Sequence, residues 1–143
     1  MTALAFKTIG LIGFGEAGGI LGHDLMRRGG VAARAYDILF EDAARGPAMR
    51  AKLAAAKVEA ASDHAAAARG ADLVISAVTA ASSSAVARAL APHLAAGQVY
   101  LDINSVSPEA KRKSAAVVEA SGADYVEAAV MARGISGEVR MRF

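Results

Sequence analysis

Three glycines near the start of the chain have a spacing that implies ligand chemistry. The segment TIGLIGFGEAG places Gly13, Gly15 and Gly18 in the pattern GxGxxG, directly after an apolar run and directly before an amphipathic stretch. In a strand–turn–helix, the first glycine permits a tight bend, the second lets the backbone approach a pyrophosphate, and the third lets the helix pack closely. The helix N-terminus adds unpaired N–H groups and the positive end of the helix dipole, which favour an anion. The pattern predicts a dinucleotide-binding turn whose contacts are Gly13, Phe14, Gly15, Glu16, Ala17 and Gly18.

An acidic residue follows at the separation that such a site requires. Asp37 ends the next predicted strand, about twenty residues beyond the glycine motif, where a carboxylate binds the adenosine ribose. A carboxylate accepts hydrogen bonds from the ribose hydroxyls and repels a 2′-phosphate, and the next residues, Ile38, Leu39 and Phe40, bring no cation. We therefore expect NAD as the cofactor rather than NADP. The alternative is a solvent-facing acid at a strand end.

Polar residues also follow two later predicted strands. Val78 and Thr79 end one of them, and Asn104 and Ser105 follow the other. Ligands of open parallel sheets lie outside the carboxyl ends of the strands, so we expect these residues to flank the nicotinamide half of the cofactor. Asn104 and Ser105 are candidates to hydrogen-bond the carboxamide or a substrate. The alternative is that they cap the helix that begins at Pro108.

The elements that position these residues follow from hydrophobic periodicity. Short apolar runs alternate with longer alanine-rich stretches, which is typical of a parallel sheet covered by helices on both faces. The expected fold is α/β, a single doubly wound domain of the Rossmann type. Strands are predicted at 8–12, 33–36, near 58, 73–78, 99–103 and 125–130, and helices at 17–28, 41–57, 65–69, 83–95 and 108–120. Gly46 and Pro47 lie inside the second helical stretch, so that helix is expected in two pieces.

Composition and charge exclude several classes of function. The 143 residues include 16 basic and 14 acidic side chains, and a net charge of +2 indicates no nucleic acid partner. The run Lys111 to Lys113 is interpreted as a solvated helix face. With no cysteine there is no disulfide and no thiolate chemistry, which is compatible with a reducing compartment, and a cytoplasmic location is expected. No apolar run approaches the roughly twenty residues that cross a bilayer, so no membrane partner is expected.

The three histidines show no pattern that implies chemistry. His23, His64 and His93 have neither a matched carboxylate nor the spacing of metal ligands. Each is interpreted as a surface or packed histidine. No metal and no catalytic residue are assigned.

The glycine motif, Asp37 and the segment DINSVSP from Asp102 to Pro108 together resemble the N-terminal domain of the β-hydroxyacid and 6-phosphogluconate dehydrogenase superfamily. The resemblance covers residues 7 to about 131, and residues 1–131 are expected to form the NAD(P)-binding domain. It implies hydride transfer to or from a small hydroxy acid, and it makes Asn104 and Ser105 the substrate-side candidates. A related architecture that reduces imines or pyrrolines is an alternative that differs chiefly in its substrate.

The chain departs from that family beyond the sixth predicted strand. The family carries a serine and glycines for a substrate carboxylate where this sequence has Met131, Ala132 and Arg133, a pattern closer to the phosphogluconate-dehydrogenase-like branch. Family members continue into a helical domain that supplies a catalytic lysine, whereas no lysine follows Val130 here. Residues 132–143 are expected to be a truncated or altered continuation without regular structure. The chain alone is then expected to be inactive and to self-associate through apolar surface near Val130 and Met131. The alternative is a catalytically silent module that binds NAD(H) or a partner.

Overall fold

A six-stranded parallel sheet organises the chain, and the computed structural model describes residues 6–133 and 138–142. The spatial order β3-β2-β1-β4-β5-β6 reverses direction between β1 and β4, which is the doubly wound arrangement that the sequence predicts. The strands are β1 (Thr8–Ile12), β2 (Ala32–Tyr36), β3 (Glu59–Ala60), β4 (Leu73–Ser76), β5 (Val99–Asp102) and β6 (Asp124–Glu127).

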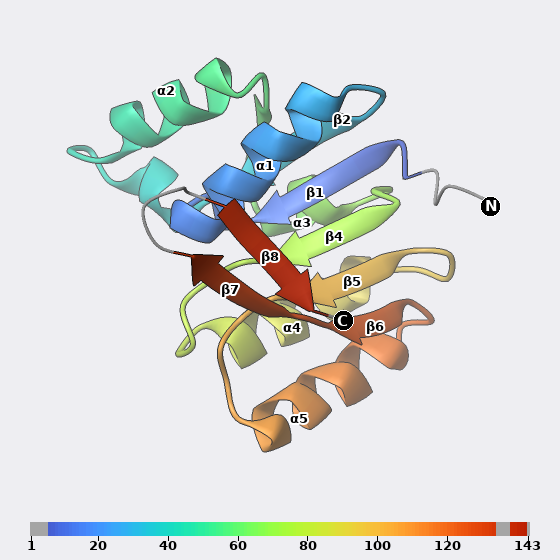
Figure 1. The fold of residues 1–143 in the computed structure, drawn as a ribbon. Helices are drawn as coiled ribbons and strands as arrows, with labels where there is room; N and C mark the ends of the chain where they lie inside the picture. The colour runs from blue at the N-terminus through green and yellow to red at the C-terminus, as the bar shows by residue number, and fades with distance from the viewer. Residues whose placement is uncertain (1–5, 134–137, 143) are drawn as a thin grey trace.

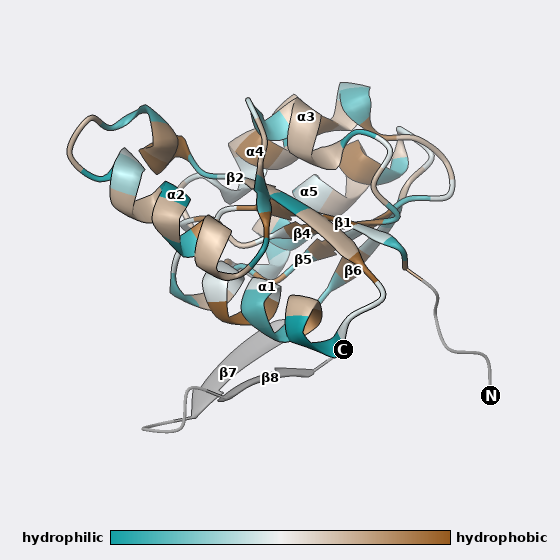
Figure 2. Cartoon of the chain, turned by 90° about the horizontal axis from the view of Figure 1, so that it is seen from above, coloured by the Kyte–Doolittle hydropathy of each residue, from teal (hydrophilic) through white to brown (hydrophobic). Residues whose placement is uncertain are grey.

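Helices cover both faces of this sheet, and Figures 1 and 2 show α1 and α2 on one face and α3, α4 and α5 on the other. The central strands are mostly apolar because both of their faces are covered; every residue of β4, for example, is buried. The helices are α1 (Glu16–Arg28), α2 (Gly46–Ala55), α3 (His64–Ala68), α4 (Ser83–Leu90) and α5 (Pro108–Glu119), with 3-10 turns η1 (Ile38–Glu41) and η2 (Ala91–His93). In the described residues, none of the helices has the length and apolar character needed to cross a membrane.

Proline decides where two of the helices begin and end. The helix predicted at 41–57 in two pieces is instead one shorter helix, α2, and Pro47 lies in its first turn, where the missing N–H costs nothing. The carboxylate of Asp42 accepts hydrogen bonds from the N–H groups of Ala44 and Arg45 in the turn that separates η1 from α2. The predicted helix at 83–95 ends earlier, at Leu90, because Pro92 follows and sits in η2.

The end of the chain differs from the prediction. We expected one strand at 125–130 and no regular structure after it. Instead β6 ends at Glu127, and β7 (Ala129–Arg133) pairs antiparallel with β8 (Glu138–Arg142) outside the main sheet, with β8 close to α1 in Figure 1. The expectation that 132–143 has no regular structure was wrong, because β8 depends on its partner strand, which a local periodicity does not reveal. The side chains of Val130 and Met131, and residues 134–137 and 143, lie outside the described part.

Candidate dinucleotide-binding site

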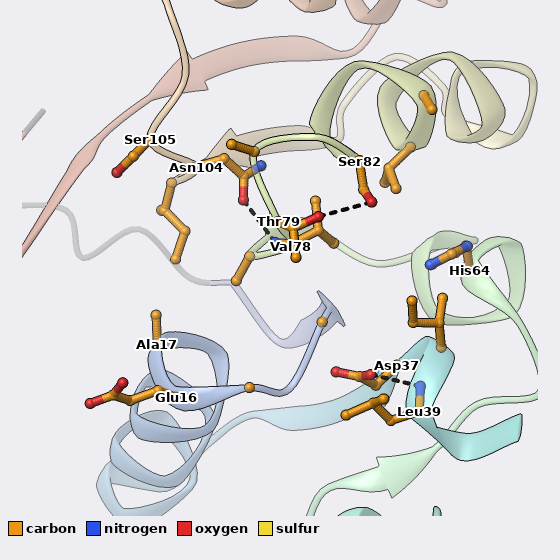
Figure 3. Close-up of a pocket in the computed structure, with 18 of the residues that line it drawn as sticks. Glu16, Ala17, Asp37, Leu39, His64, Val78, Thr79, Ser82, Asn104 and Ser105 are labelled. Atoms are coloured by element: carbon orange, nitrogen blue, oxygen red, sulfur yellow. Dashed lines mark hydrogen bonds between the residues drawn. The ribbon is translucent and has the colours of Figure 1, made fainter. Parts of the chain in front are cut away.

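A cleft of about 860 Å³ opens at the carboxyl ends of β1, β2, β4 and β5, where the strand order reverses. Figure 3 shows its two ends, with Asn104 and Ser105 at one and Asp37 and His64 at the other. Most of the predicted site residues line it: Gly13, Gly15, Glu16, Ala17, Asp37, Val78, Thr79, Asn104 and Ser105. Two predicted residues, Phe14 and Gly18, are not among the lining residues; the side chain of Phe14 is buried beneath α1.

Two of the motif glycines are required by close backbone packing. Gly13 has a φ of 91°, and a Cβ there would lie 2.2 Å from the carbonyl oxygen of Ala77. A Cβ at Gly18 would lie 2.3 Å from the carbonyl oxygen of Gly13. Because neither contact can be relieved without moving backbone, these glycines fix the turn and the approach of α1 to β1.

Gly15 has a different environment, since a Cβ there would meet no atom within 4 Å. It is the N-cap residue of α1, and no side chain in the described part of the chain caps that helix end. The first turn of α1 therefore presents its N–H groups and the positive end of its dipole to the cleft. Such an open turn has room for the backbone to contact an anionic group such as a pyrophosphate.

Asp37 is held by the backbone on both sides of its carboxylate. Oδ2 accepts a hydrogen bond of 2.8 Å from the N–H of Phe14, and Oδ1 accepts one of 2.9 Å from the N–H of Leu39. The side chain is buried at the edge of the cleft rather than solvent-facing, so the alternative interpretation from sequence was wrong. Each carboxylate oxygen has a second lone pair, so the group retains capacity to accept hydroxyl hydrogens.

Asn104 joins the two loops at the opposite end of the cleft. Its Oδ1 accepts a hydrogen bond of 2.7 Å from the N–H of Val78, and its Nδ2 donates to the hydroxyls of Ser76 and Ser83 at 3.0 and 3.2 Å. Neither Asn104 nor Ser105 caps α5, because Ser107 is the N-cap and accepts from the N–H of Ala110. Both amide hydrogens of Asn104 are therefore used within the protein, whereas its Oδ1 keeps a second lone pair. A hydrogen bond from Asn104 or Ser105 to the carboxamide or to a substrate stays a prediction.

Comparison with known proteins identifies the family. The sequence model of a family described as the NAD binding domain of 6-phosphogluconate dehydrogenase matches residues 8–138. The chain belongs to this family. No curated protein matches it.

Solved structures support the same fold. A conserved hypothetical protein from Sinorhizobium meliloti 1021 is 40% identical with a TM-score of 0.84, over 93% of this chain and 46% of that one. The 3-hydroxyisobutyrate dehydrogenase of Mycobacterium tuberculosis is 21% identical with a TM-score of 0.78, over 89% and 41% of the two chains. An imine reductase from Pseudomonas sp. is 19% identical with a TM-score of 0.74, over 89% and 42%. The last two show the fold alone, and this chain spans less than half the length of all three.

Next to the Asn104 loop, this member of the NAD-binding-domain family has an ion pair that is largely withdrawn from solvent. Asp102 is 1% exposed, and its Oδ1 lies 3.3 Å from Nζ of Lys111 and accepts the N–H of Asn104 at 2.9 Å. The hydroxyl of Tyr125 donates to Oδ2 of Asp102 at 2.6 Å. Burial, followed by this hydrogen bond, raises the pKa of Tyr125 above its ordinary value. The interpretation of Lys111 as part of a solvated face was wrong; Arg112 and Lys113 are exposed as expected.

The cleft is also lined by residues that the sequence did not assign to the site. These are Ile38, Leu39 and His64, together with Ala85, Val86 and Ala89 of α4. His64 was interpreted only as a surface or packed histidine, because nothing in the order of residues brings α3 beside the end of β2. Burial lowers the pKa of His64 below its ordinary value. Among the described residues, no group of three acidic, histidine or cysteine side chains is arranged to hold a metal ion.

Proposed function

We propose that this chain binds NAD(H) as the cofactor-binding part of an oxidoreductase that transfers hydride between nicotinamide and a small hydroxy acid. One observation carries the proposal: the open turn at Gly15, the uncapped N-terminus of α1 and the carboxylate of Asp37 lie in one cleft. These are the groups that a pyrophosphate and an adenosine ribose require. When bound, the nicotinamide supplies the hydride chemistry.

The electrostatics of the cleft favour NAD over NADP. The lining residues in the described chain include Glu16 and Asp37 but no lysine or arginine. A 2′-phosphate on the adenosine ribose would approach the Asp37 carboxylate without a cation to balance its charge. Because Asp37 is anchored by two backbone N–H groups, it cannot swing away without leaving the N–H groups of Phe14 and Leu39 unpaired.

The opposite end of the cleft supports binding rather than proton transfer. Ser105 is exposed there, and the hydroxyl of Thr79 donates to that of Ser82 at 3.0 Å. The lining residues described there, Val78, Thr79, Asn104 and Ser105, have no ionisable side chain. A hydroxy acid or an imine needs a general acid or base, so that group is supplied by residues outside the described cleft. The same observation favours the second candidate, a module that binds NAD(H) without turnover.

The cofactor proposal is tested by calorimetric titration with NADH and NADPH. We expect tighter binding of NADH. Asp37→Asn is expected to weaken binding of NADH by roughly ten- to a hundredfold, because a hydrogen bond to a charged group contributes about 1.5–3 kcal/mol. Glu16→Gln is the matched control, since it removes the other acid of the cleft but not the ribose ligand. Tighter binding of NADPH by the unaltered chain would contradict the assignment to NAD.

The reaction class is tested by assaying NAD-dependent oxidation of 3-hydroxy acids and reduction of cyclic imines with the same protein. We expect neither substrate to turn over with this chain alone. Rapid turnover of either one would show that the proton-transfer group lies within the chain and would contradict the proposed division of roles.

A further inference from the structure

The cleft continues past Asp37 into an apolar end that has a single imidazole. Ile38 is 63% exposed there, which is unusual for a large apolar side chain in this structure, and Val86 and Ala89 line the same cleft from α4, which contacts α3. His64 is partly buried and lines this end from α3. Figure 3 shows its ring on the Asp37 side of the cleft, away from Asn104 and Ser105.

The position of the His64 ring is fixed by its neighbours. The ring centroid lies 4.7 Å from that of Tyr36, with the two planes inclined at 77°, and Tyr36 packs in turn against Phe40 at 5.5 Å. The backbone at His64 is fixed as well, because α3 begins there and Asp63 accepts a hydrogen bond of 2.7 Å from the N–H of Ala66. A ring held in this way loses little conformational entropy when it contacts a ligand.

The direction in which the cofactor binds brings its adenine to the His64 end of the cleft; this step rests on the function proposed above. With the pyrophosphate at Gly15 and the ribose at Asp37, the adenine extends away from Asn104 and toward His64. We propose that His64 is a specificity-determining residue that hydrogen-bonds the edge of the adenine ring, while Ile38 and Val86 contact its faces.

The chemistry of the two rings is complementary. The lowered pKa of His64 keeps its imidazole neutral at physiological pH, and a neutral imidazole has one N–H donor and one acceptor nitrogen. The edge of adenine likewise offers an amino donor and acceptor nitrogens. The apolar residues beside His64 suit the flat faces of a heterocycle, which gain from leaving water.

The test compares ligands that contain adenosine with one that lacks it. Calorimetry with NADH, ADP-ribose and reduced nicotinamide mononucleotide is carried out on the whole chain and on His64→Leu and His64→Gln. Leucine keeps bulk without a hydrogen bond, and glutamine keeps a donor and an acceptor. His93→Leu is the control, because His93 lies on η2 beside Arg69, at 3.3 Å, and does not line the cleft. His64→Ala replaces the leucine variant if leucine disturbs α3, since alanine is the best helix former.

We expect His64→Leu to lower the affinity for NADH and for ADP-ribose by about fivefold, as the loss of one hydrogen bond of about 1 kcal/mol implies. His64→Gln is expected to restore most of that loss, and binding of the mononucleotide is expected to stay unchanged. Equal affinity of His64→Leu and the wild type for ADP-ribose would overturn the role of His64 and leave the proposed function standing. Absence of NADH binding by the wild type would instead overturn the proposed function itself.

Discussion

Asn104 Oδ1 accepts a 2.7 Å hydrogen bond from the backbone N–H of Val78 and so joins the loops that follow β5 and β4. This hydrogen bond, called here the Asn104–Val78 clamp, connects two loops that line the cleft. Asn104 is 5% exposed, and its other polar atoms are satisfied by neighbouring serine hydroxyls, so the clamp is part of the protein interior.

Removing the clamp is expected to reduce stability. Asn104→Ala leaves the N–H of Val78 without its partner, and we expect a loss of about 1–3 kcal/mol in the free energy of unfolding. Urea unfolding followed by circular dichroism measures it. Ser105→Ala is the control, because Ser105 is exposed and its replacement is expected to change stability by less than about 0.5 kcal/mol. Equal stability of the two variants would contradict the clamp.

The motif glycines are expected to divide into two groups. Gly13→Ala and Gly18→Ala each drive a Cβ into a carbonyl oxygen, at 2.2 and 2.3 Å, so both variants should lose more than about 2 kcal/mol or fail to fold. Gly15→Ala has open space for its Cβ and a negative φ of −70°, so its stability should fall by less than about 1 kcal/mol. Thermal unfolding of the three variants separates the groups. A fold that tolerates Gly13→Ala as well as Gly15→Ala would contradict the packing of the turn.

The ion pair between Asp102 and Lys111 is expected to contribute more to stability than the exposed ion pair between Glu109 and Lys113. Lys111→Met leaves the Asp102 carboxylate without its cation, and breaking a buried pair costs about 3–5 kcal/mol. Lys113→Met, three-quarters exposed beside Glu109, is the control and should change stability by less than about 1 kcal/mol. Chemical unfolding of both variants provides the comparison, and similar losses would support the solvated-face interpretation instead.

Alkaline pH is expected to lower the free energy of unfolding, because three tyrosines have a raised pKa in the folded chain. Burial raises the pKa of Tyr36 and Tyr125 and raises that of Tyr100 to about 12, against an ordinary value of 10.0. A phenol with a raised native pKa binds its proton more tightly when folded, so its contribution is complete below about pH 10 and is lost above it. Unfolding free energies measured from pH 8 to above pH 11 should therefore fall only in the upper part of that range.

The hydrogen bond between Tyr125 and Asp102 has its own prediction. Tyr125→Phe removes a hydrogen bond to a charged group, which is expected to cost about 1.5–3 kcal/mol near neutral pH. The difference in unfolding free energy between Tyr125→Phe and wild type should narrow above pH 10. In that range the unfolded wild-type chain loses the Tyr125 proton more readily than the folded chain, so the stability of the wild type falls. A constant difference across that range would show that the loss comes from packing alone.

The sequence predicted the parallel sheet and the glycine turn well, because these depend on local patterns. The apolar runs of the central strands and the GxGxxG spacing are properties of consecutive residues. Asp37 was placed correctly at the cleft because the separation between the motif and the end of β2 is set by one strand–helix–strand unit.

The sequence did not predict features that depend on distant partners. His64 reaches the cleft only because α3 packs beside the end of β2, and the side chain of Lys111 is only 11% exposed because it pairs with Asp102 at the end of β5. A lysine next to two other basic residues has the pattern of a solvated face, and the acid that pairs with it is nine positions earlier in the chain. The β7–β8 hairpin was missed for the same reason, since each strand is defined by the other.

The most direct test of the account is a calorimetric titration of the wild-type chain and Gly15→Ala with NADH. We predict saturable binding of one NADH per wild-type chain, and loss of that binding in Gly15→Ala while its unfolding temperature stays close to wild type, because the added methyl group occupies the space of the pyrophosphate. No saturable binding by the wild-type chain, or equal affinity in the folded variant, would contradict the assignment of this cleft as the cofactor site.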